Sequence, residues 1–141
     1  MKFPGRMRRV RGSSGQSLVE FSISVFLLIM LLLAVVEIGR MLLVYTTVAN
    51  AARVGARYAV VHGADSAVTV TDVQNVVKNY LRAAPLDTTQ AGLIINVTYG
   101  GGGNAIGSTV TVDVAYPYDP FTTYFPFTTS LGSTSQGVIA F

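Results

Sequence analysis

An apolar run at residues 21–36 constrains this chain more than any other feature, because it holds sixteen consecutive residues without a charge. Leu18 and Val19 extend the run in the N-terminal direction, past Glu20. As a helix, residues 18–36 would rise about 28 Å, close to the roughly 30 Å hydrocarbon thickness of a bilayer. We therefore predict a transmembrane segment at about residues 18–38.

The charge distribution predicts which way this segment crosses the membrane. Residues 1–15 carry five basic side chains and no acidic one, whereas the rest of the chain carries five basic and seven acidic side chains. Such a cluster could bind nucleic acid. Directly before an apolar run, the simpler interpretation is the positive-inside signal that keeps this end in the cytoplasm. We therefore predict a basic cytoplasmic leader at 1–15 and no nucleic-acid partner.

The helix is expected to continue beyond the membrane. There is no proline between Pro4 and Pro85, and small and apolar residues recur at spacings of three and four from residue 41 to residue 56. That spacing is typical of a helix with one buried face. We expect one long helix over residues 16–62, with a transmembrane half and an amphipathic half, and Gly63 supplies a plausible end.

Residues 63–141 are expected to form a small exported α+β domain. A second helix is predicted to start near Thr71, with a threonine cap and Asp72 in its first turn, and to end at Pro85. We expect this short helix to pack on a small antiparallel sheet, because its apolar residues line one face.

The predicted sheet comes from alternating apolar and polar residues. Strands are expected at 93–99 and 109–116, joined by a glycine-rich hairpin loop. The end of the chain, 136–141, is a candidate third strand. The aromatic and proline residues of 116–127 are expected to be extended or turned, with their rings capping the core.

Glu20 lies just inside the apolar run, where an ionisable side chain is costly. One interpretation is that its carboxylate simply reaches the headgroup region. Its context suggests another, since the basic leader ends at Gly15, Gln16 begins the next segment, and Phe21 follows Glu20. This arrangement resembles the cleavage region of type IV pilin-like precursors, in which glutamate is the fifth residue of the mature chain.

The resemblance implies that a prepilin peptidase cuts between Gly15 and Gln16. Cleavage would expose an amine on Gln16, whose reference pKa is near 8, and the Glu20 carboxylate can neutralise such an amine of its own chain or of a neighbouring subunit. The processing site is therefore predicted at Gly15 and Gln16, and an assembly role at Glu20 and Phe21.

A second stretch, EIGRMLLVYTTVANAARVGARYAVVHG, resembles TadE-like proteins of the tight adherence (Tad) pilus machinery. Its first element is an acidic-x-Gly-Arg pattern at Glu37, Gly39 and Arg40. Its second is an Ala-Ala-Arg-x-x-Ala-Arg pattern, which comprises Ala51, Ala52, Arg53, Ala56 and Arg57. The resemblance covers residues 15 to about 63.

Membership of this family would imply a pseudopilin or minor pilin that takes part in assembling a Tad (type IVb-like) pilus. The protein would be a single-pass protein of the bacterial inner membrane, with its C-terminal domain periplasmic or extracellular, either in the fibre or at its base. The implied partners are the prepilin peptidase, other pilins and pseudopilins, the assembly machinery and the lipid bilayer.

The same residues also have interpretations that need no family. Ala51, Gly55 and Ala59 form a ridge of small residues at spacing four, with Ala52 and Ala56 beside it, and such ridges let helices approach closely. The partner is either the chain's own sheet or another subunit.

Four charged residues in this region are candidates for ion pairing. Glu37 and Arg40 form a local i, i+3 pair, worth a few tenths of a kcal/mol. Arg53 and Arg57 lie one turn apart and either pair with acids or remain solvated.

Catalytic chemistry is not indicated. With one histidine, no cysteine and scattered acids, the chain offers no metal cluster or nucleophile–base set. We predict no enzyme activity, cofactor, metal or small-molecule substrate, and His62 is interpreted as a helix-end residue.

Two alternatives to a pilin-like role remain. An uncleaved single-span anchor of another envelope assembly or secretion system would make Glu20 incidental. A secreted enzyme with a signal peptide would need a small-x-small cleavage site after the apolar run, where residues 37–40 instead continue the helix.

Overall fold

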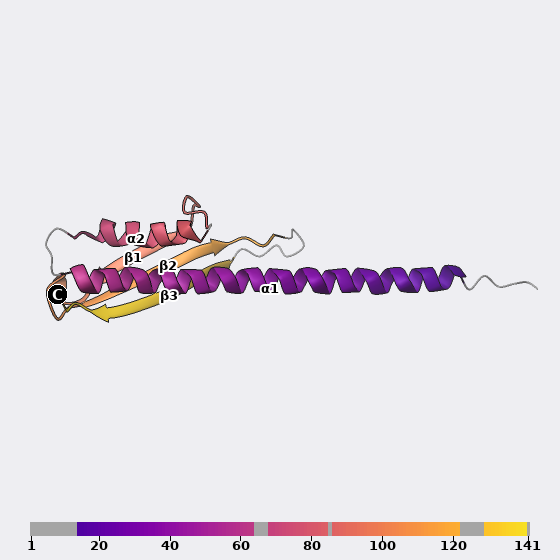
Figure 1. Ribbon diagram of the computed structural model, residues 1–141, viewed down its shortest axis with the longest axis horizontal. Coiled ribbons are helices and arrows are strands. Elements are labelled where there is room, and N and C mark those ends of the chain that lie inside the picture. Colours follow the sequence, from indigo (N-terminus) through magenta and orange to yellow (C-terminus); the bar gives the residue numbers. More distant parts are fainter. Residues whose placement is uncertain (1–13, 64–67, 85, 122–128, 141) are drawn as a thin grey trace, which may run out of the picture. The chain divides into compact units, whose positions relative to one another are not determined.

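The computed structural model describes residues 14–63, 68–84, 86–121 and 129–140. Two helices precede a three-stranded antiparallel sheet (Figure 1). The expected α+β class is therefore confirmed. The elements are α1 (Ser14–His62), α2 (Val70–Ala83), β1 (Ile94–Tyr99), the 3-10 turn η1 (Gly100–Gly102), β2 (Thr109–Tyr118) and β3 (Thr129–Val138).

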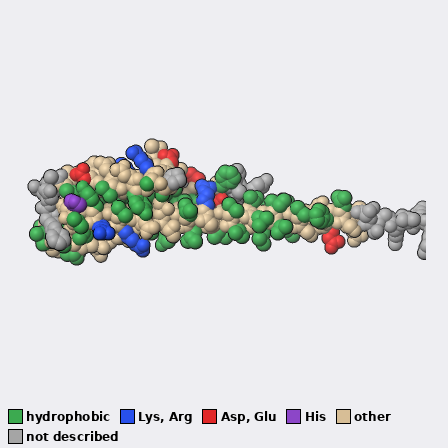
Figure 2. All heavy atoms as spheres, in the orientation of Figure 1, with side chains coloured by type: hydrophobic (Ala, Val, Ile, Leu, Met, Phe, Trp, Pro, Cys, Tyr) green, Lys and Arg blue, Asp and Glu red, His purple; other side chains and the backbone are tan. Residues whose placement is uncertain are grey.

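Two units make up the chain, Met1–Val36 and Glu37–Phe141, and α1 belongs to both. In the first unit no residue of 15–36 is buried. By length and composition, α1 is the one helix in the described part of the chain that could cross a membrane. Apolar side chains gather along it in Figure 2. The predicted leader lies almost entirely outside the described residues.

Two hydroxyl groups inside the apolar stretch bond within the helix itself. Ser22 Oγ donates to the Leu18 carbonyl at 2.8 Å, and Ser24 Oγ donates to the Glu20 carbonyl at 2.9 Å. These local bonds satisfy the serine donors without water, which suits a helix that faces lipid.

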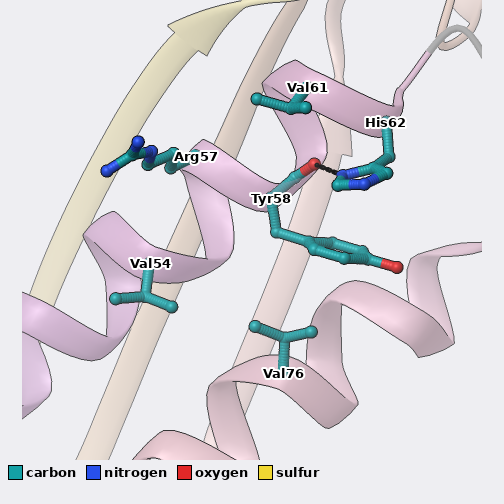
Figure 3. Close-up of a pocket in the computed structure, with 6 residues that line it drawn as sticks. All are labelled: Val54, Arg57, Tyr58, Val61, His62 and Val76. Carbon is teal, nitrogen blue, oxygen red and sulfur yellow. Dashed lines mark hydrogen bonds between the residues drawn. The ribbon is translucent and has the colours of Figure 1, made fainter.

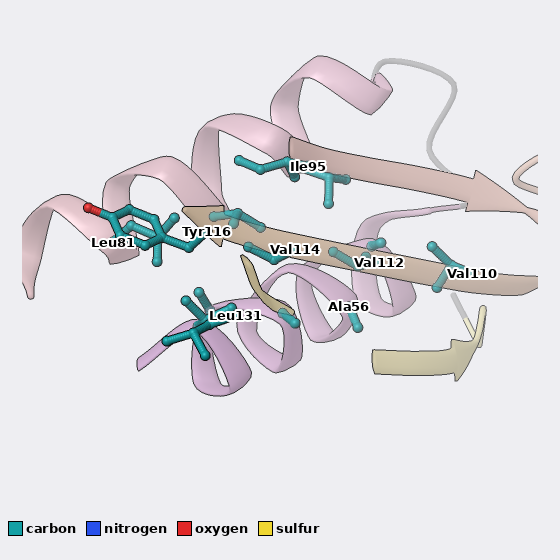
Figure 4. Close-up of a cluster of buried hydrophobic side chains, with 14 of the residues drawn as sticks. Ala56, Leu81, Ile95, Val110, Val112, Val114, Tyr116 and Leu131 are labelled. Carbon is teal, nitrogen blue, oxygen red and sulfur yellow. The ribbon is translucent and has the colours of Figure 1, made fainter. Parts of the chain in front are cut away.

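In the second unit, the C-terminal half of α1 and the whole of α2 pack on the sheet. The buried side chains of α1 recur at helical spacing, and those of α2 are Val73, Val77 and Leu81. They meet the inward face of β2, where every second residue is buried (Figure 4). The buried residues of β2 are Val110, Val112, Val114, Tyr116 and Tyr118.

The sheet order is β1-β2-β3, and both pairings are antiparallel. β2 extends two residues beyond its predicted end at residue 116, through Pro117 to Tyr118. Pro117 is tolerated because β1 begins at Ile94, opposite Ala115, so that Pro117 pairs only with Ser130 of β3.

The third strand occupies Thr129–Val138, so it begins seven residues before the predicted 136–141 and overlaps it only at residues 136–138. Its sequence, TSLGSTSQGV, does not alternate between apolar and polar residues. Leu131 is its one buried apolar residue. Gly137 suits this strand because an added Cβ would lie 2.5 Å from Val60 Cγ2 of α1. Residue 141 and the second half of the aromatic stretch, residues 122–127, lie outside the described residues.

Helix α2 begins earlier than predicted, since its cap is Thr69 rather than Thr71. The backbone N–H and hydroxyl of Thr69 both donate to Asp72 Oδ2, at 2.8 and 2.7 Å. These hydrogen bonds lower the pKa of Asp72. An aspartate at the third helical position can reach back to the cap, whereas one next to the cap cannot. The predicted stop at Pro85 lies outside the described residues, and α2 ends at Ala83.

Candidate functional site

The predicted processing region lies at the start of α1. Gly15 and Gln16 are helical and exposed, and a Cβ added at Gly15 would meet nothing within 4 Å. Glu20 and Phe21 are exposed one turn later. Among the described residues, no basic side chain pairs with the Glu20 carboxylate. The acidic group therefore faces outward from the helix.

The ridge of small residues lies inside the second unit. All five of its members are buried: Ala51, Ala52, Gly55, Ala56 and Ala59. A Cβ added at Gly55 would lie 2.5 Å from Val77 Cγ2 and 3.4 Å from Val112 Cγ1. Of the two arrangements considered, the structure contains the intramolecular one, in which α1 approaches α2 and β2 closely.

Glu37 and Arg40 take part in a wider set of contacts than the predicted local pair. Tyr118 Oη donates a hydrogen bond to Glu37 Oε1, and the Phe121 backbone N–H lies 3.3 Å from Glu37 Oε2. Arg40 Nη2 donates to the Asp119 carbonyl at 2.9 Å. We call these five residues the clasp, because they fasten the end of β2 to α1.

The two charges of the clasp also face each other, although weakly. Arg40 Nη1 lies 4.0 Å from Glu37 Oε1, and the Arg40 guanidinium carbon lies 5.2 Å from the centre of the Tyr118 ring. The Glu37 side chain is only 12% exposed, against 43% for Arg40. The hydrogen bonds to Glu37 and the cation–π contact of Arg40 therefore complement the long ion pair.

Tyr118 is the buried centre of the clasp, with 2% of its surface exposed. Burial raises the pKa of its phenol, and the hydrogen bond to Glu37 and the negative charge of Glu37 raise it further, while Arg40 opposes them. The phenol is therefore protonated at physiological pH and remains a hydrogen-bond donor to Glu37.

The sequence did not indicate the clasp, since Tyr118 follows Glu37 by 81 positions. The available signal was the dense aromatic and proline stretch around residue 118, which we interpreted only as a cap on the core.

The comparison with protein families bears on this same helix. The family model described as TadE-like protein matches residues 15–57. This match confirms the expected resemblance to the TadE-like family over these residues. No curated protein and no solved structure matches the chain.

The TadE-like match covers the apolar stretch, Glu37 and Arg40 of the clasp, and all but Ala59 of the small-residue ridge. It ends before α2 and the sheet, so the clasp partners on β2 and the following turn lie beyond it. Together with the apolar α1, the match indicates a Tad pilus-related, membrane-anchored protein.

The remaining TadE-like residues, Arg53 and Arg57, are exposed on α1. Arg53 Nη1 donates to Asn50 Oδ1 at 3.3 Å. In the described part of the chain, neither arginine forms an ion pair. Arg57 borders a surface hollow of about 420 Å³ between α1 and α2 (Figure 3). The hollow is lined by Val54, Arg57, Tyr58, Val61, His62 and Val76.

His62 lies at the end of α1 and contacts its own helix. Its ring stacks on Tyr58 with centroids 4.5 Å apart, and its Nδ1 lies 3.1 Å from the Tyr58 carbonyl. Within the described ranges, no group of three or more histidine or acidic side chains could hold a metal ion.

Proposed function

We propose that this protein is a pseudopilin or minor pilin that takes part in assembling a Tad (type IVb-like) pilus. A prepilin peptidase removes residues 1–15, residues 18–38 cross the inner membrane, and residues 63–141 lie on its periplasmic or extracellular side. The observation that carries the proposal is the TadE-like match on a helix whose apolar residues 15–36 are all unburied.

Glu20 supports the processing step. Its carboxylate projects from an apolar helix and has no cationic partner among the described residues. A lone charge in lipid costs on the order of 2.5–3.5 kcal/mol at mid-span and less near the edge. An amine freed on Gln16 lies about one helical turn away on the same chain, and a neighbouring subunit brings another.

Arg53 and Arg57 are the proposed sites of ion pairing with other pilus components, because both guanidinium groups are exposed and lack acidic partners within the described part of the chain. The small-residue ridge acts indirectly, by packing α1 against α2 and β2 within the second unit, Glu37–Phe141, which we call the folded unit.

Mass spectrometry of the protein from cells with an active prepilin peptidase tests the proposal. The expected mature chain begins at Gln16. A matched Gly15→Leu variant should retain the leader, because the bulky side chain blocks the peptidase. A wild-type chain that still begins at Met1 in those cells would contradict the proposal and favour the uncleaved anchor.

A further inference from the structure

The exposed apolar surface of α1 continues past Glu37 and Arg40, the first charged residues after the apolar stretch. Ile38 is 66% exposed and Leu42 is 60% exposed, although both belong to the folded unit. Phe121, in the turn after β2, is 82% exposed, more than any other large apolar side chain in the described ranges. Ile38, Met41, Leu42, Tyr45 and Leu131 also line an apolar hollow of about 260 Å³.

We propose that this part of the folded unit, residues 37–45 and 118–121, lies in the headgroup layer of the outer leaflet, with Phe121 as an interfacial anchor. The proposal rests on the membrane span of the proposed function. It adds a second lipid-contacting element to α1, the turn that follows β2.

The clasp lowers the free-energy cost of placing Glu37 and Arg40 at this depth. Glu37 and Arg40 are the only charged side chains at positions 37–50. Glu37 receives hydrogen bonds from Tyr118 and from the Phe121 backbone, and Arg40 donates to the Asp119 carbonyl. Glu37 and Arg40 therefore already have partners. Asp119, the other charged side chain within residues 37–45 and 118–121, is exposed, and at headgroup depth its carboxylate remains in contact with polar groups and water.

Helix length supports the same depth. With residues 18–36 in the roughly 30 Å hydrocarbon layer, the outer headgroup layer, about 5–8 Å thick, takes up about the next turn of helix, from Glu37 to Met41. Tyr45 follows one turn later, on the outer side of this layer. The next polar side chains after it are Thr46, Thr47 and Asn50.

The clasp also determines how deep the sheet lies. Since Phe121 N–H is within 3.4 Å of both carboxylate oxygens of Glu37, the turn after β2 shares the depth of Glu37 on the helix. A lipid occupant is favoured over a second copy because the exposed apolar residues continue the lipid-facing sequence of α1 along one helix.

The chain contains no tryptophan, so single-tryptophan variants report depth directly. Full-length Phe121→Trp is reconstituted in vesicles of phosphatidylethanolamine and phosphatidylglycerol, with and without brominated acyl chains. Thr98→Trp is the matched control, because Thr98 is exposed on β1 and pairs with Thr111, seven residues along β2 from Tyr118. Leu27→Trp reports the span itself.

We expect Phe121→Trp to show blue-shifted emission and to lose most of its intensity in brominated vesicles, while Thr98→Trp is unaffected by bromine and is quenched by aqueous acrylamide. If Leu27→Trp is quenched by bromine but Phe121→Trp behaves like Thr98→Trp, the interfacial placement is wrong and the span stands. A blue shift at position 121 without bromine quenching would also overturn it, since a protein surface would then cover the residue. Loss of quenching at position 27 would contradict the span itself.

Discussion

The hydroxyl of Tyr118 donates a hydrogen bond to the carboxylate of Glu37, 81 positions earlier in the chain. This bond joins the end of β2 to the start of the folded unit on α1. From the sequence we predicted only a local pair between Glu37 and Arg40, whereas in the structure Glu37 connects the helix to the sheet. Two predictions follow from this contact, and two more concern the small-residue ridge and Glu20.

Replacing Tyr118 by phenylalanine should destabilise the folded unit. The variant keeps the ring but removes a donor to a nearly buried carboxylate, and such a bond is worth about 1.5–3 kcal/mol. Denaturant unfolding in detergent, followed by circular dichroism, would measure the loss. Tyr99→Phe is the matched control, because the buried Tyr99 hydroxyl has no partner among the described residues. Equal losses in the two variants would contradict this role of the clasp.

The stability of the unit should fall at alkaline pH. The pKa of Tyr118 is raised in the folded chain, so its contribution is fully present below the unfolded value near 10 and is lost as pH rises through the folded value. The melting temperature should therefore decline above about pH 10. The melting temperature of Tyr118→Phe should be lower at neutral pH and should decline less steeply with rising pH. Some decline should remain, because the pKa values of Tyr99 and Tyr116 are also raised. An identical slope in both proteins would count against the assignment.

Gly55→Ala should destabilise the unit by about 1–3 kcal/mol through overpacking, because the new Cβ would lie 2.5 Å from Val77 Cγ2. Gly39→Ala is the control on the same helix, since its Cβ meets nothing within 4 Å. It should gain up to about 1 kcal/mol of helix propensity. Adding Val77→Ala to Gly55→Ala should recover part of the loss, and additive effects would show that the two sites do not touch.

Glu20→Ala should abolish pilus assembly without releasing the protein from the membrane. The substitution removes the carboxylate proposed to neutralise the Gln16 amine, but it makes the span more apolar. Electron microscopy counts the pili, and alkaline extraction of membranes checks insertion. Ser24→Ala, one turn further along, is the matched control and should assemble normally. Normal assembly by the Glu20 variant would favour the uncleaved anchor.

Most of the helices and strands could be predicted from local sequence patterns. Sixteen uncharged residues in succession predicted the apolar part of α1, and the alternation of valine with polar residues predicted β2. These signals work because burial repeats with the period of the element. The strand β3 lacked such a signal, since serine, threonine and glycine fill its exposed and half-buried positions alike.

Local sequence patterns could not predict contacts between residues far apart in the chain. The sequence identified Glu37 and Arg40 through the TadE-like pattern, but their partners at Tyr118, Asp119 and Phe121 become neighbours only after the sheet has formed. The small-residue ridge was identified from spacing alone, and the sequence left open whether its partner was internal.

Because α1 contributes Val44, Val48 and the alanines of the ridge to the core, the anchor and the folded unit share one structural element. A shortened chain that begins after His62 would therefore lose one wall of its interior, and Val77 and Val112 would face water. A water-soluble fragment intended for crystallisation should begin near Glu37, where the second unit begins, and it should carry polar replacements at Ile38 and Leu42.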